Sequence, residues 1–132
     1  MVFMILTPDL RQSIIATARS YIGTPKSPAF NCVDFVRKVL ATNGIVLPLI
    51  NPPTQPPIEW GIKDLSLCND AFGEIIFLKR ILSQSDRPWT HVALVVSQSE
   101  CIHCSSYFGR QVSKTSFEDL FTVYRFVPSG VC

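Results

Sequence analysis

The stretch FNCVDFVRKVL, residues 30–40, places a cysteine at the start of an apolar pattern with helical spacing. This pattern predicts a helix over about Val33 to Thr42. Asn31 is a favoured N-cap residue and Asp34 follows three positions later, so we expect Asn31 to cap the helix and Cys32 to begin it. Free N–H groups and the helix dipole would lower the pKa of a thiol there, which makes Cys32 a candidate nucleophile. The alternative is a small buried apolar residue at a helix end.

A nucleophilic thiol needs a base, and the chain contains two histidines. His91 opens an apolar run that predicts a strand, and His103 lies in the next predicted strand. If the hairpin between them centres near Gln98, both histidines lie on one face of the sheet, diagonally within reach, whereas a shift of one residue separates them. A thiol, an imidazole and a third polar group that orients the imidazole form the general Cys–His arrangement. Cys32, His91 and His103 are therefore the candidate triad, the alternative being that each histidine is structural.

The rest of the chain divides into a helical first half and a β-rich second half. Thr7-Pro8-Asp9 predicts the start of a first helix, which Gly23 ends. Five prolines between residues 46 and 70 exclude a regular element over most of that stretch, which is either a surface connection or a lid. The remaining pattern predicts strands over residues 74–82, 91–96, 100–108 and 122–128, and a helical turn over 116–121. Helices followed by closely connected strands indicate an α+β fold with an antiparallel sheet.

Composition limits the classes of function. The chain has 132 residues, of which 47% are hydrophobic and 17% charged, so we expect one globular domain over residues 1–132. The net charge of +2, without long charged runs, argues against a nucleic-acid partner. No apolar run is long enough to span a membrane, and no basic segment precedes the apolar start, so we expect no secretory signal. Five cysteines without such a signal favour a reducing compartment, that is, a cytoplasmic protein at synthesis.

Five segments carry patterns that occur together in one family. They are ATARSYIGTP (16–25), FNCVDFVRKVL (30–40), FGEIIFL (72–78), THVALVV (90–96) and CIHCSS (101–106). In this order and spacing they resemble the NlpC/P60 superfamily of papain-like cysteine peptidases. The resemblance implies a papain-like α+β fold in which N-terminal helices pack on a central antiparallel sheet.

The resemblance also implies roles for the three candidate residues. Cys32 would be the nucleophile, with its backbone N–H in an oxyanion hole, His91 the general base and acid, and His103 the group that orients His91. Members of the family mostly hydrolyse amide bonds in peptidoglycan stem peptides, typically between D-glutamate and a diamino acid. The expected partners are therefore peptidoglycan fragments or another peptide amide, with an inhibitor or immunity protein as a further candidate. No metal or cofactor is expected.

Five further residues are predicted to contact the substrate. Asn31, Val33 and Asp34 flank the nucleophile where the family has Asp before it and Ser-Gly after it. Trp60 lies in the proline-rich stretch, and Trp89 lies just before His91. Without a secretory signal, a wall hydrolase would leave the cell by a specialised secretion system or by lysis, or would act inside on recycled muropeptides.

Four other functions remain open. Cys101 and Cys104 form a C-x-x-C, but on a strand these side chains would point to opposite faces, which disfavours a redox pair. A zinc site built from these cysteines, His103 and Cys68 would lack a second ligand pair at normal spacing. Cys132, near the end of the sequence, is expected to have no part in a site. An inactive papain-like binding domain and a papain-like acyltransferase are the remaining alternatives, because a triad alone does not separate hydrolysis from acyl transfer.

Overall fold

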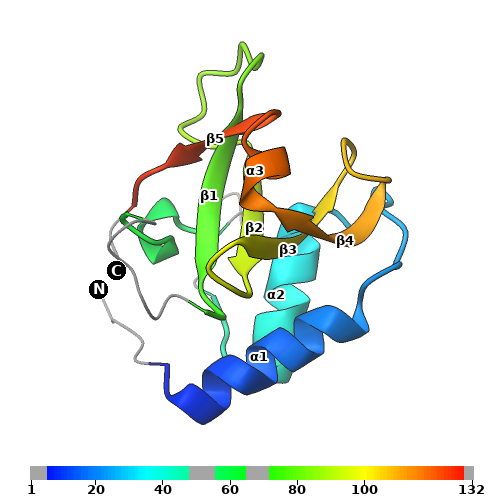
Figure 1. Ribbon diagram of the computed structural model, residues 1–132, viewed down its shortest axis with the longest axis vertical. Coiled ribbons are helices and arrows are strands. Elements are labelled where there is room, and N and C mark those ends of the chain that lie inside the picture. Colours follow the sequence, from blue (N-terminus) through cyan, green and yellow to red (C-terminus); the bar gives the residue numbers. More distant parts are fainter. Residues whose placement is uncertain (1–5, 48–55, 65–71, 130–132) are drawn as a thin grey trace.

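The computed structural model describes residues 6–47, 56–64 and 72–129. In these ranges the five strands form one antiparallel sheet in the order β4-β3-β2-β1-β5, and helices precede and interrupt the strands (Figure 1). The elements are α1 (Pro8–Ser20), α2 (Cys32–Thr42), the 3-10 turn η1 (Ile58–Trp60), β1 (Ile75–Arg80), β2 (His91–Val95), β3 (Glu100–Ser105), β4 (Gln111–Ser116), α3 (Phe117–Leu120) and β5 (Tyr124–Val127). The predicted α+β fold with N-terminal helices on an antiparallel sheet is confirmed.

The sheet separates two hydrophobic clusters, because successive residues of a strand point to opposite faces. On one face α1 and α2 pack against side chains such as Val92, Leu94 and Ile102. On the other face Ala93 and Val95 pack with Leu120 of α3. All five residues of β2 are buried, since this central strand is covered on both sides. Figure 1 shows α1 lying across the lower edge of the sheet, beside α2.

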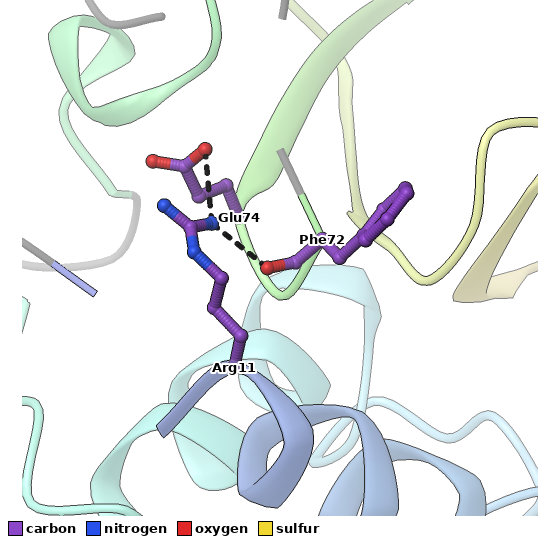
Figure 2. Close-up of polar contacts among 3 residues, drawn as sticks. All are labelled: Arg11, Phe72 and Glu74. Carbon is purple, nitrogen blue, oxygen red and sulfur yellow. Dashed lines mark hydrogen bonds and ion pairs between the residues drawn. The ribbon is translucent and has the colours of Figure 1, made fainter. Parts of the chain in front are cut away.

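Polar contacts fix α1 against the start of β1. Thr7 caps α1 by accepting a hydrogen bond from the N–H of Leu10, as predicted. Nη1 of Arg11 donates a hydrogen bond to the carbonyl oxygen of Phe72 at 2.9 Å and lies 3.4 Å from Oε2 of Glu74. Figure 2 shows both contacts as dashed lines. Gly73 lies between these partners at φ +85°, and a Cβ there would come within 3.3 Å of the Arg11 backbone. The close approach of helix and strand therefore requires glycine.

The sequence pattern missed one strand and overextended the four others, most of all at the end of β3. Strand β4 was not predicted, because QVSKTS is a mostly polar edge strand without an apolar run. Strand β3 ends at Ser105 instead of residue 108, since the chain turns there through Gly109 and Arg110, both at positive φ. Residues 48–55 and 65–71, which include most of the proposed lid and Cys68, lie outside the described residues, as does Cys132.

Candidate active site

A capping box presents Cys32 as the first residue of α2. The carboxamide oxygen of Asn31 accepts hydrogen bonds from the N–H groups of Val33 at 3.0 Å and Asp34 at 3.1 Å. In return, the Asp34 carboxylate accepts one from the N–H of Asn31 at 3.0 Å. The predicted cap and helix start are confirmed, and the cap does not engage the N–H of Cys32.

The hairpin between β2 and β3 brings the two histidines together. Leu94 pairs with Ile102 and Val95 with Cys101, so the hairpin centres at Gln98, as required for both histidines to share a face. Nε2 of His91 lies 2.8 Å from Nδ1 of His103, and both rings are buried. Since Nε2 of His91 is occupied by this contact, Nδ1 is the nitrogen that remains for a substrate or a thiol.

Three polar residues that the sequence did not identify surround the histidine pair. Nε2 of His103 lies 2.9 Å from Oγ1 of Thr115. The Tyr124 ring stacks on His91 with centroids 4.4 Å apart and an interplanar angle of 9°, and its hydroxyl lies 2.7 Å from Oγ of Ser105. Thr115 belongs to the unpredicted strand β4, and Tyr124 belongs to β5. The Thr115 contact fixes the orientation of the His103 ring, and the Tyr124 stacking fixes that of the His91 ring.

Cys32 and His91 line one cavity of about 520 Å³. Of the five predicted substrate contacts, three line this cavity: Asn31, Val33 and Trp89. The other two do not: the Asp34 side chain is engaged in the capping box, and Trp60 packs against the hydrophobic core instead. His103 lies behind His91 and does not line the cavity, which suits a group that acts through His91.

The cavity is electrostatically positive. Of the described residues that line it, Lys26 and Arg80 carry positive charges and none is a carboxylate. The Arg80 guanidinium lies 4.3 Å from the ring centroid of Tyr107, a cation–π contact that holds the charge at the cavity wall. This arrangement favours a ligand that carries a negative charge near the thiol.

Burial determines the protonation of the thiol and the imidazole. It raises the pKa of Cys32, although N–H groups of Val92 and Val33 and the charge of Lys26 act in the opposite direction. N–H groups at the helix start do act in the expected direction, but the loss of hydration outweighs them, so the net shift of this pKa is upward and the expected net lowering is wrong. Burial also lowers the pKa of His91 well below its ordinary value, with smaller contributions from the charges of His103 and Lys26. Both directions favour the uncharged forms, a thiol on Cys32 and a neutral imidazole on His91, in the cavity that the two residues share.

The C-x-x-C pair is divided by the sheet. Cys101 belongs to the hydrophobic cluster around α3, and Cys104 belongs to the cluster beneath α1 and α2. The predicted divergence of these side chains is confirmed, so they cannot form the vicinal pair of a redox motif. Within the described ranges, no three His, Cys, Asp or Glu side chains gather so that they could hold a metal ion. Nor is any helix there both long and apolar enough to cross a membrane.

The fold is that of NlpC/P60 proteins of known structure. No family model matches this sequence, and no curated protein is similar enough in sequence to identify a relative. Among solved structures, an NlpC/P60 family protein from Bacillus cereus superposes with a TM-score of 0.64 at 20% identity, covering 89% of this chain and 40% of its own. NlpC1 from Trichomonas vaginalis gives 0.68 at 17% identity, with 91% and 42% covered. The P60 domain of an antigen from M. avium subspecies paratuberculosis gives 0.61 at 16%, with 94% and 96% covered.

These similarities show the class of fold, an α+β arrangement of helices on an antiparallel sheet. More narrowly, the chain has the NlpC/P60 fold, and the resemblance seen in the sequence is confirmed at that level. The chain spans about two fifths of the Bacillus and Trichomonas proteins but nearly the whole of the isolated P60 domain.

The burial of His103 predicts a loss of stability in acid. Burial lowers its pKa from 6.5 to about 4, so between these values the unfolded chain binds more protons than the folded one. The free energy of unfolding should therefore fall as the pH drops from 7 to 4, by roughly 3 kcal/mol from this group. Urea unfolding at both pH values would measure the fall, which should be smaller in His103→Gln. An equal fall in both proteins would contradict the prediction.

Proposed function

We propose that this chain is a cysteine amidase that hydrolyses amide bonds in peptidoglycan stem peptides, between D-glutamate and a diamino acid. One observation carries the proposal: a cysteine at the capped start of a helix shares a cavity with a histidine whose far nitrogen is 2.8 Å from a second histidine. Nucleophile, base and orienting group are then Cys32, His91 and His103. The NlpC/P60 fold supports this assignment.

The proposed reaction starts from a neutral Cys32 thiol and a neutral His91 imidazole. As Sγ of Cys32 attacks the amide carbon, its proton moves to Nδ1 of His91, and the backbone N–H of Cys32 donates to the developing oxyanion. The imidazolium then gives its proton to the leaving amine as the C–N bond breaks, which leaves a thioester. His91 next takes a proton from water as the hydroxyl adds to the thioester carbon. The C–S bond then breaks, the His91 imidazolium returns its proton to the departing sulfur to restore the thiol, and the product leaves as a carboxylic acid that ionises in water.

The charge of the cavity supports an acidic acyl group. A D-glutamyl residue linked through its γ-carboxyl keeps a free α-carboxylate close to the scissile bond. Lys26 and Arg80 provide two cations at the cavity wall for such a group, and no carboxylate opposes it among the lining residues that the structure describes. Hydrogen bonds to a charged partner contribute about 1.5–3 kcal/mol each, enough to select a carboxylate over an amide.

Arg80→Gln should raise KM for a synthetic L-alanyl-γ-D-glutamyl-diamino acid peptide by about ten-fold or more, since one cation is lost. Chromatography of the products, with the newly freed amine quantified, would measure the rate. The same peptide with its α-carboxyl amidated should have a higher KM with the native protein, and Arg80→Gln should leave that KM unchanged.

Arg125→Gln is the matched control, because this exposed arginine lies on β5 and does not line the cavity. Its KM should equal that of the native protein. If Arg80→Gln raised KM equally for both peptides, Arg80 would stabilise the cavity wall without recognising the carboxylate. If neither peptide were cleaved, the proposed substrate would be wrong.

A further inference from the structure

We propose that Thr115 and Ser113 of β4 are positioning residues that fix the proton positions on both histidines, so that Nδ1 of His91 is the unprotonated nitrogen. The inference rests on the proposed function for its catalytic meaning, but the proton positions themselves can be observed without a substrate. Neither hydroxyl lines the cavity, so any effect on the chemistry must pass through His103 and His91.

The two residues continue a chain of polar contacts away from the cavity. On β4, Ser113 lies directly opposite His103 and Thr115 opposite Cys101, so both side chains share the face of the histidines. Oγ1 of Thr115 lies 2.9 Å from Nε2 of His103 and 3.4 Å from Oγ of Ser113. Ser113 in turn donates to the carbonyl of Phe108 at 3.4 Å. This series of polar contacts thus ends at a backbone carbonyl in the turn between β3 and β4.

The carbonyl end gives this chain of contacts a direction. A carbonyl only accepts, and each hydroxyl has one proton to donate. Ser113 gives its proton to Phe108, so it must accept from Thr115, and Thr115 must then accept from Nε2–H of His103. Nδ1 of His103 is left to accept from Nε2–H of His91. Only this arrangement satisfies all four contacts.

The direction matters because the two histidines could otherwise hold their protons the opposite way. If Thr115 donated to His103, Nδ1–H of His103 would donate to His91, and the proton of His91 would lie on Nδ1. A ring in that state cannot accept the thiol proton at Nδ1. The turn that supplies the terminal carbonyl is itself held in place, since the Lys26 N–H donates to the Arg110 carbonyl and Pro25 forms a bridge with Gln111.

Long-range proton–nitrogen NMR correlations on the full nitrogen-15-labelled chain at pH 7 would show which ring nitrogen carries each proton. We expect both histidines of the native protein to be Nε2–H tautomers. Thr115→Val keeps the side-chain shape but removes the hydroxyl, so the Nδ1–H form should appear at His103, and Thr115→Ser should restore the native spectrum. Ser113→Ala, which frees Thr115 to donate, should shift the tautomers in the same direction.

An Nδ1–H tautomer on His91 of the native protein would overturn the proposal, and so would unchanged spectra in both Thr115→Val and Ser113→Ala. In the amidase assay, Thr115→Val should lower kcat at least about ten-fold with little change in KM, and Thr115→Ser should recover it. An inactive native protein with the expected tautomers would refute the proposed function but not the proton arrangement. An active protein with Nδ1–H tautomers would refute the proposed proton arrangement but not the proposed function.

Discussion

Cys32→Ala is expected to abolish amide hydrolysis while leaving the fold intact. Without the sulfur no acyl-enzyme can form, so kcat/KM should fall by roughly 10⁴-fold or more. Alanine is a strong helix former, and the capping box depends on Asn31 and Asp34 instead of on the thiol. Far-ultraviolet circular dichroism and urea unfolding should therefore match the native protein, while product formation from the γ-D-glutamyl peptide disappears.

Cys104→Ala is the matched control, because Cys104 lines the same cavity and is also a free thiol. It has no role in the proposed chemistry, so its variant should retain activity within a few-fold. Hydrolysis that survived in Cys32→Ala would refute the assignment of the nucleophile. Equal losses in the two variants would indicate that the cavity needs its packing and not a particular thiol.

The start of α2 could be predicted because its causes are local. The capping box involves residues 31–34 alone, and Asn31 and Asp34 are favoured at those positions in many helices. The pairing of the histidines could also be predicted, since a hairpin centred at Gln98 fixes which residues face each other. Both features depend on segments that are adjacent in the chain.

The surroundings of the histidines could not be predicted, because they come from strands that are distant in the sequence. Thr115 is placed by the pairing of β3 with β4, and the polar pattern of β4 did not identify it as a strand. Tyr124 reaches His91 only because β5 adds to the far side of β1. The net direction of the Cys32 pKa shift could not be predicted for a related reason: the helix end is a local feature, whereas the burial that raises the pKa depends on the whole fold.

His91→Gln should lower kcat/KM by about 10²- to 10⁴-fold, the range lost when a general base is removed. Glutamine is close to histidine in size and has an amide N–H that can still donate to Nδ1 of His103, so the buried network should survive. It cannot accept the thiol proton at neutral pH. Steady-state kinetics on the γ-D-glutamyl peptide would give the loss, and the thermal unfolding temperature would show whether the fold is retained.

The pH profile separates a lost base from a damaged site. Burial lowers the pKa of His91 well below 6.5, so the imidazole is already neutral at pH 7, and kcat/KM of the native protein should decline only as the pH falls through that low value. The residual activity of His91→Gln should lack this decline. Because thiol and base act in one step, Cys32→Ala combined with His91→Gln should be no worse than Cys32→Ala alone. An acid decline that persisted in His91→Gln would assign the base to another group, and additive losses would show that the two residues act separately.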